Sequence, residues 1–170
     1  RALLNVTIGE GLKELQYRIF AKCTFLKKID LPDSLTFISN GAFSDSALME
    51  NGLSPLKYAD NWLIGYNTNH TDDSVVTVKK GTVGIASEAL YKHQMETLNL
   101  PDSLKYINSG AISYTSNLKT VTLPQGLERI ESDAFKLSGL SEITIPESVE
   151  YIGDAAFYQE PWNSNFEKIT

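Results

Sequence analysis

LKTVTLPQGLERIESDAF, residues 118–135, decides the fold because the chain repeats this stretch with small changes from one end to the other. A second copy, LSEITIPESVEYIGDAAF, occupies residues 140–157. A fixed period of about 20 to 50 residues is typical of solenoid and other repeat architectures. One such repeat cannot bury its apolar face alone, whereas stacked neighbours bury a continuous core. The chain is therefore expected to be a stack of repeats.

Two columns of apolar residues keep this period along the chain. The first is Val6, Ile29, Val76, Leu98, Val121, Ile143 and Ile169, and the second is Phe20, Phe43, Leu90, Ile112, Phe135 and Phe157. Consecutive members are 22 or 23 residues apart, except for an interval of 47 residues in each column, after Ile29 and after Phe43, and one of 26 residues before Ile169. The distance between the two columns never changes. All length variation therefore lies after the second column, where we expect a surface loop.

The beginning of each repeat has the pattern of a short strand. In residues 120–123 (TVTL), threonine alternates with an apolar residue, which is typical of a half-buried strand. Pro124 follows and should end the strand, because proline cannot donate a hydrogen bond to a ladder. The same position in other repeats is occupied by Pro32, Pro101 and Pro146.

The rest of each repeat has a different period. Leu127 and Ile130 lie three residues apart and predict a second short extended or coiled face. Residues 134–135 (AF) then predict a turn or short helix on the outer wall. We expect one column to form an interior ladder, namely Leu15, Ile38, Ile85, Ile107, Ile130 and Ile152.

The two quoted copies closely resemble the BspA-like leucine-rich repeats of bacterial surface proteins and of some parasitic protists. The shared pattern is L-x-x-I-x-I-P-x-S-V-x-x-I-G-x-x-A-F-x-x-C, and the resemblance covers nearly the whole chain in six copies. It implies a right-handed leucine-rich-repeat solenoid of the α/β class, rich in β-structure. A short parallel β-sheet would form the concave face, and turns or short helices the convex face.

This chain departs from the family pattern at two points. Cys23 matches the cysteine of the pattern, but other residues replace it elsewhere, namely Ser46, His93, Thr115, Ser138 and Glu160. The chain also lacks the asparagine ladder of ordinary leucine-rich repeats. Its corners combine proline with serine or glycine instead, as in residues 124–126 (PQG).

The domain organisation predicted from these patterns is a single solenoid over residues 1–170, with about six to seven repeats of 22–23 residues. The repeat is irregular at residues 49–75, where residues 58–66 (YADNWLIGY) are apolar enough to form a strand or hairpin in place of a missing repeat. An irregular coil or a projecting contact loop are the alternatives for this segment. Neither end has a polar capping repeat, so we expect a fragment of a longer chain or ends that partner chains cover.

Composition and charge exclude several classes of partner. The net charge of −6 and the pI near 4.9 argue against nucleic acid and anionic membranes, which attract clustered Lys and Arg. No apolar run is long enough to cross a bilayer, so no membrane-spanning segment is expected. Cys23 is the single cysteine, which excludes an internal disulfide. We expect it to be a small buried hydrophobic residue.

No motif for catalysis, cofactor binding or metal binding is present in the sequence. His70 and His93 lie in loops without a zinc-binding pattern, and no GxSxG nucleophile elbow occurs. Residues 81–84 (GTVG) lack the lysine of a phosphate-binding loop. We therefore predict that this segment is not an enzyme and takes no cofactor or metal.

The candidate binding surface is the outward side of the predicted strands together with aromatic residues beside them. Threonine also suits an exposed strand for structural reasons, so β-propensity explains much of its enrichment. Tyrosine is favoured at interfaces, although packing between repeats is an equally good explanation for these positions. The candidate residues are Thr77, Asn99, Thr120, Thr122, Thr144, Tyr106, Tyr151, Trp62 and Trp162.

Function is indicated only through the family resemblance. It implies an interaction or adhesion module of a cell-surface or secreted protein, whose partner is another protein, such as a host extracellular or cell-surface protein. The strand face and the irregular loops would make the contact. One alternative is a structural spacer that holds another domain off the cell wall. Another is an accessory binding domain of a larger secreted enzyme, and self-association end to end or edge to edge is a further expectation.

Overall fold

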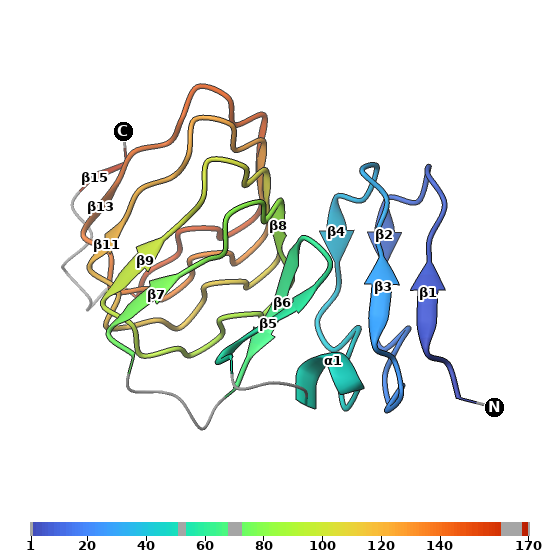
Figure 1. The fold of residues 1–170 in the computed structure, drawn as a ribbon. Helices are drawn as coiled ribbons and strands as arrows, with labels where there is room; N and C mark the ends of the chain where they lie inside the picture. Colours follow the sequence, from blue (N-terminus) through green and yellow to red (C-terminus); the bar gives the residue numbers. More distant parts are fainter. Residues whose placement is uncertain (1, 51–53, 68–72, 161–167, 170) are drawn as a thin grey trace.

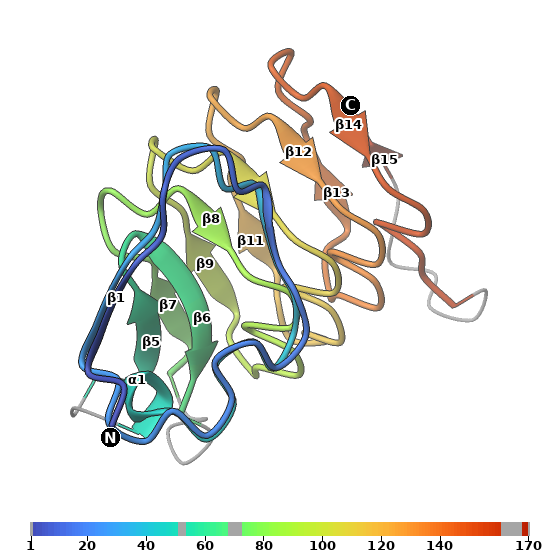
Figure 2. The same ribbon diagram turned by 90° about the vertical axis from the view of Figure 1, so that its right-hand side faces the viewer.

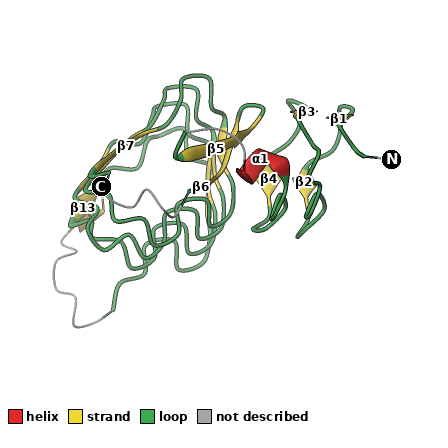
Figure 3. Cartoon of the chain, turned by 60° about the horizontal axis from the view of Figure 1, so that its bottom comes forward, coloured by secondary structure: helices red, strands yellow, loops and turns green. Residues whose placement is uncertain are grey.

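The computed structural model describes residues 2–50, 54–67, 73–160 and 168–169 and shows a solenoid made of short strands and turns (Figure 1). Within the described part of the chain, the only helix is the four-residue α1 (Ala47–Glu50), drawn in red in Figure 3. The expected β-rich solenoid is confirmed. Turns, rather than short helices, occupy the side that faces away from the strands.

The first column of strands follows the first apolar column of the sequence. Its members are β1 (Asn5–Thr7), β3 (Lys28–Asp30), β7 (Val75–Thr77), β9 (Thr97–Asn99), β11 (Thr120–Val121), β13 (Glu142–Ile143) and β15 (Lys168–Ile169). Paired neighbours are parallel and one repeat apart, as shown by Leu98 opposite Val121. We call this column the first sheet, although its hydrogen bonds divide it into three ladders.

A second column of strands runs along the adjacent side of the solenoid. Its members are β2 (Glu14–Leu15), β4 (Phe37–Ile38), β6 (Trp62–Tyr66), β8 (Gly84–Ile85), β10 (Tyr106–Ile107), β12 (Arg129–Ile130) and β14 (Tyr151–Ile152). The strands from β6 to β14 form one continuous parallel ladder, which we call the second sheet. The face that the sequence predicted as extended or coiled is thus extended.

The third side of each coil contains no strand but is still hydrogen-bonded to its neighbour. Backbone N–H groups of alternate residues donate to the next coil, as from Leu90 to Ala111 over 2.8 Å and from Ile112 to Ala134 over 2.8 Å. Each coil contributes residues with positive φ to this side, at Arg18, Gly41, Glu88, Gly110, Asp133 and Ala155. This side therefore adds a third line of hydrogen bonds along the solenoid, even though only two of these left-handed positions are glycine.

The interior is filled by the apolar columns that the sequence predicted. Leu15, Ile38, Ile85, Ile107 and Ile130 are all buried, whereas Ile152 in the last coil remains half exposed. The phenylalanine column stacks where it is continuous: the rings of Phe135 and Phe157 lie 5.4 Å apart, centroid to centroid. Each repeat thus buries its apolar face only against the next one.

A hairpin replaces the missing repeat in the 47-residue interval. Strand β5 (Leu56–Ala59) pairs with β6 in antiparallel fashion through a two-residue loop that contains Asp60 at φ 54°. Strand β6 then pairs in parallel with β8. Of the possibilities left open for this segment, the structure shows the hairpin, and it supplies a strand to the second sheet only.

The axis of the solenoid changes direction at this hairpin. In Figure 1 the coils from β7 onward are viewed along their axis, and those with β1 to β4 are viewed from the side. In Figure 2, turned by 90°, the coils with β1 to β4 are viewed along their axis and the later coils from the side. We call residues 2–50 the N-terminal stack and residues 54–160 the C-terminal stack. Figure 1 also shows the hairpin between the two stacks.

The column that starts with Cys23 holds small or polar side chains. Cys23 is half-buried and packs against the core, while Ser46, His93, Thr115 and Ser138 are buried. Thr115 donates its hydroxyl to the carbonyl of Ile112 over 2.8 Å, and His93 accepts the N–H of Met95 at Nδ1 over 3.1 Å. Thr115 and His93 thus bond within their own turn. The Ser138 hydroxyl instead accepts from the amide of Gln159, and the Ser46 hydroxyl has no hydrogen-bond partner within the described residues.

Replacing Ile130 with alanine should lower the free energy of unfolding by about 2 to 5 kcal/mol, because Ile130 is fully buried and a cavity would remain. Chemical denaturation measures the change. Thr122→Ala, on the exposed side of the same repeat, is the control and should change stability by about 0.5 kcal/mol or less. Equal effects of the two substitutions would contradict the assigned register.

His93 should make stability fall in mild acid. Burial lowers the pKa of His93 below the ordinary value of 6.5, although the carboxylate of Asp73 opposes this shift. Below pH 6.5 the unfolded chain therefore binds a proton that the folded protein does not, and stability is lost as the pH falls from 6.5 toward the folded pKa. Denaturation at pH 7.5 and 5.5, compared with His93→Thr, should show a smaller pH dependence in the variant. An unchanged pH dependence would refute this assignment.

Candidate functional site

The first sheet carries most of the candidate residues on one exposed face. Thr77, Asn99, Thr120, Thr122 and Thr144 are all exposed, and they lie on or directly after β7, β9, β11 and β13. The amide of Asn99 donates to the hydroxyl of Thr77 over 3.1 Å. Strand alternation explains the arrangement, because the residues between them point into the core. The structure therefore places these five residues along one side of the solenoid.

Two pairs of opposite charges lie on this side. Lys119 lies 2.9 Å from Glu96, and Lys28 lies 2.7 Å from Asp30 in the N-terminal stack. The hydrogen bond with Lys28 lowers the pKa of Asp30, and the same contact raises the pKa of Lys28. Such exposed pairs add little stability. Their effect is to leave hydroxyl and amide groups as the main recognition groups of the face.

Trp62 and Tyr106 do not belong to the exposed surface, and the sequence-based interpretation was wrong for them. Trp62 is fully buried, and Tyr106 is only 9% exposed. Their rings lie 5.9 Å apart with an interplanar angle of 7°. Gly84, in register between them, allows this arrangement, since a Cβ there would clash with the Trp62 ring.

The N-terminal stack covers these rings. Asp60, in the hairpin loop, accepts the N–H of Leu31 over 2.9 Å. Pro32 and Leu35 line a small cavity together with Tyr106. The Tyr106 hydroxyl donates to Glu128 over 3.1 Å, and burial raises its pKa. The two aromatic residues thus lie at an internal interface.

Tyr151 continues the same row of the second sheet and is exposed. The residue is 39% exposed, and the guanidinium of Arg129 lies over its ring, 4.1 Å from the ring centroid. It remains a candidate contact residue. Trp162, the last candidate, lies outside the described residues.

Asn108 holds the two stacks together, and sequence reasoning missed it. Its side chain is fully buried; Oδ1 accepts the N–H of Ile38 over 2.8 Å, and Nδ2 donates to the carbonyl of Thr36 over 3.1 Å. The N–H of Ser87 also donates to the carbonyl of Ile38 over 2.9 Å. The side-chain amide of Asn108 thus hydrogen-bonds to the backbone of β4, as the backbone of a neighbouring strand does elsewhere in the solenoid. No periodic signal marks a contact between residues 70 positions apart.

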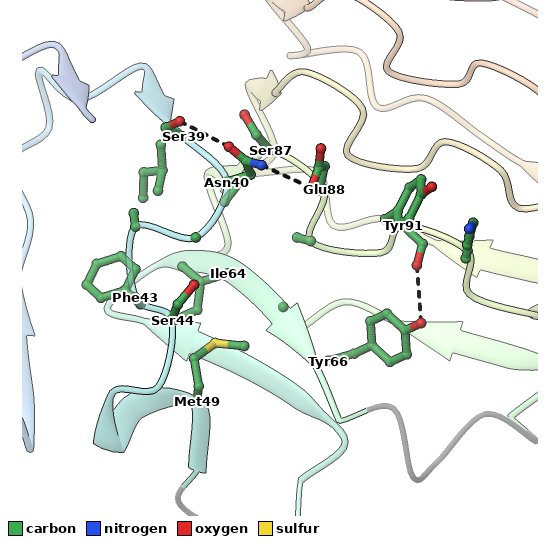
Figure 4. Close-up of a pocket in the computed structure, with 17 residues that line it drawn as sticks. Ser39, Asn40, Phe43, Ser44, Met49, Ile64, Tyr66, Ser87, Glu88 and Tyr91 are labelled. Atoms are coloured by element: carbon green, nitrogen blue, oxygen red, sulfur yellow. Dashed lines mark hydrogen bonds between the residues drawn. The ribbon is translucent and has the colours of Figure 1, made fainter. Parts of the chain in front are cut away.

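A pocket of about 410 Å³ lies at the junction of the stacks (Figure 4). Phe43, Met49 and Ile64 line one side of it, and Tyr66 and Tyr91 lie on the other. The Tyr66 hydroxyl donates to the Tyr91 carbonyl over 3.1 Å. The pocket is mainly apolar, so it could take an apolar side chain.

The rim of this pocket is polar. The amide of Asn40 donates to the carboxylate of Glu88 over 3.1 Å, which joins the N-terminal to the C-terminal stack. The buried hydroxyl of Ser87 has no hydrogen-bond partner within the described residues. The bond between Asn40 and Glu88 links the stacks, and no sequence pattern marks it because the two residues come from separate repeats.

The described residues contain no group of three or more His, Cys, Asp or Glu side chains arranged to hold a metal ion. In the same part of the chain, no helix is long and apolar enough to span a lipid bilayer. The chemistry available on the exposed faces is hydrogen bonding, aromatic contact and exposed ion pairing.

Comparison with protein families gives a match over almost the whole chain. The family model described as BspA type leucine rich repeat region matches six copies, over residues 1–62 and 66–167. A comparison with curated proteins found no match.

Solved structures with a similar fold are bacterial proteins. A leucine rich cell surface protein from Faecalibacterium prausnitzii is 20% identical with a TM-score of 0.52, and 98% of this chain covers 59% of that one. The pneumococcal vaccine antigen PcpA is 22% identical with a TM-score of 0.57, and 89% of this chain covers 47% of that one. A leucine-rich repeat protein from Bacteroides ovatus is 22% identical with a TM-score of 0.50, and 98% of this chain covers 33% of that one. This chain therefore spans about a third to three fifths of the length of these proteins.

Asn108→Ala should loosen the junction between the stacks. It would leave the buried N–H of Ile38 and the carbonyl of Thr36 without partners, at a cost of about 2 to 5 kcal/mol. The backbone N–H of Ile38 should exchange its hydrogen faster in the variant than in the wild-type chain. Chemical denaturation measures the loss in free energy of unfolding. Asn99→Ala, which removes an exposed amide, is the control and should leave Ile38 unchanged. Normal protection of Ile38 in Asn108→Ala would show that the amide does not hold β4.

Proposed function

This chain belongs to the BspA-type leucine-rich repeat family, and from this premise we propose that it is a non-catalytic protein-interaction module of a cell-surface or secreted protein. Repeat solenoids expose extended surfaces that suit protein partners. The name of the Faecalibacterium relative, a leucine rich cell surface protein, supports the proposed location. The partner in this proposal is a host extracellular or cell-surface protein.

The observation that carries the proposal is the exposed face of the first sheet. Five hydroxyl and amide side chains lie there in successive coils, at Thr77, Asn99, Thr120, Thr122 and Thr144. They stand on a scaffold whose interior is closely packed, so their positions are largely fixed before binding. Recognition would rest on shape and hydrogen bonds, because the opposite charges of the nearby ion pair between Lys119 and Glu96 neutralise each other.

Two other exposed features would assist this face. Tyr151, beneath the guanidinium of Arg129, offers an aromatic and cationic contact on the second sheet. The pocket between the stacks could accept an apolar side chain beside Phe43 and Met49. Interfaces commonly gain most of their affinity from a few such anchors.

Binding of immobilised fibronectin, laminin and collagen to the purified chain tests the proposal. Saturable binding to at least one of them is expected, and Thr77→Lys combined with Asn99→Lys should weaken it at least tenfold. Both residues lie on the exposed face, so the substitutions place two long charged side chains there without disturbing the core.

The matched control is Thr24→Lys combined with Ser116→Lys, which adds the same charge at exposed positions away from the strands. Binding should be close to wild type in this control. Absence of saturable binding to every matrix protein, or equal weakening by both double variants, would count against the proposed interaction face and favour a spacer.

A further inference from the structure

The first sheet is open between two consecutive coils. Strands β7, β9 and β11 form one ladder, and β13 pairs only with β15, so β11 and β13 do not pair. Figure 2 shows β13 standing apart from β11. The break is specific to this side of the solenoid.

The same two coils are closed on their other sides. In the second sheet, β12 pairs with β14 in parallel. On the third side, the N–H of Phe135 donates to the carbonyl of Ala156 over 2.7 Å, and that of Asp133 donates to Asp154 over 2.9 Å. The coils therefore remain attached but diverge toward the first sheet.

A cleft of about 490 Å³ lies in this opening. Thr120 and Thr122 line one wall, and Glu142 and Thr144 line the other. The lining also includes apolar residues of both strands, Val121 and Ile143 among them, and none of the described residues that line it is aromatic. The volume falls within the range of about 300 to 1,000 Å³ that is common for binding sites.

The walls of the cleft are strand edges. An unpaired edge exposes backbone N–H and C=O groups that can pair with another extended chain. β11 has its ladder partner, β9, on one side only, and β13 has β15 on one side only. The two remaining edges face the same cleft. Peptides commonly bind proteins by adding a strand to such an edge.

We propose that the cleft between β11 and β13 binds one extended peptide segment of a partner protein as an added strand of the first sheet. This inference rests on the proposed interaction function and specifies how a partner is held. An extended peptide can bond to both edges at once through its own backbone. A saccharide lacks that backbone, and the described residues of the lining offer it no aromatic ring to stack on.

The cleft also indicates the sequence pattern of the peptide. Side chains of a strand alternate between its two faces. An apolar residue should point inward beside Val121 and Ile143, and its two neighbours should be small and polar, like Thr120 and Thr122. The strands of this protein have that pattern themselves, as in residues 120–122 (TVT).

The probe for the test is a fluorescent heptapeptide, LKTVTLP, that copies residues 118–124. Fluorescence anisotropy should show saturable binding to the wild-type chain. A peptide with proline in place of its central valine lacks one N–H donor and should bind at least tenfold more weakly. Hydrogen exchange in the chain should slow at residues 120–123 and 142–144 when the first peptide binds.

Matched protein variants locate the site. Thr144→Trp places a bulky ring in the cleft and should weaken binding of the heptapeptide at least tenfold. Thr24→Trp makes the same change at an exposed position in a turn away from the cleft and from the proposed interaction face, and it should leave binding unchanged. Far-UV circular dichroism and thermal melts of both variants confirm that they are folded.

Several results would overturn the proposal. Absence of heptapeptide binding to the wild-type chain would do so. Equal affinity of the two tryptophan variants for the heptapeptide, or equal affinity of the wild-type chain for the heptapeptide and the proline peptide, would do so as well. A wild-type dimer in analytical ultracentrifugation that Thr144→Trp dissociates would also do so, because a second copy would then occupy the cleft. Continued binding of a matrix protein without heptapeptide binding would reject the cleft alone and leave the proposed function intact.

Discussion

Each coil of this protein depends on its neighbours for its backbone hydrogen bonds. Two strand columns and the turn side all bond from one coil to the next, and the bonds within a coil are confined to tight turns, as from the N–H of Leu127 to the carbonyl of Pro124. Buried backbone groups without partners are costly, and each coil must therefore align with the next at three places. This requirement explains the constant distance between the apolar columns and confines length variation to the loops. It also explains why the departures from alignment, at the hairpin and between β11 and β13, are informative.

Much of the fold could be predicted from the sequence because its determinants are local and repeat. Ile130 and its counterparts lie inside because their period matches the stacking of coils, and residues 58–66 form a hairpin because they are apolar in an interval where the period fails. The threonine face followed from simple strand alternation. The bend could not be predicted in this way. It depends on Asn108 and β4, which are far apart in sequence and belong to no shared pattern.

The errors at Trp62 and Tyr106 have the same origin. Both residues lie in one register row on the outward side of the second sheet and are nevertheless buried, and residues of the N-terminal stack lie beside Tyr106. The repeat pattern of the sequence describes how neighbouring coils pack. It contains no information about the packing of the N-terminal stack against the second sheet. The opening between β11 and β13 was missed for a related reason, since the sequences of both strands fit the pattern of paired strands. Candidate residues on the first sheet were therefore placed correctly, while the shape of the surface between them needed the structure.

The junction built on Asn108 has a consequence for how such proteins vary in length. All of the described bonds between the N-terminal stack and the rest of the chain end on residues up to Asn108, within the first coils after the hairpin. Coils beyond β12 take no part in them. Whole repeats could thus be gained or lost farther along the chain without altering the direction in which the first coils point. The length of the solenoid and the direction of its first coils are therefore set by different segments, and each can change while the other stays constant.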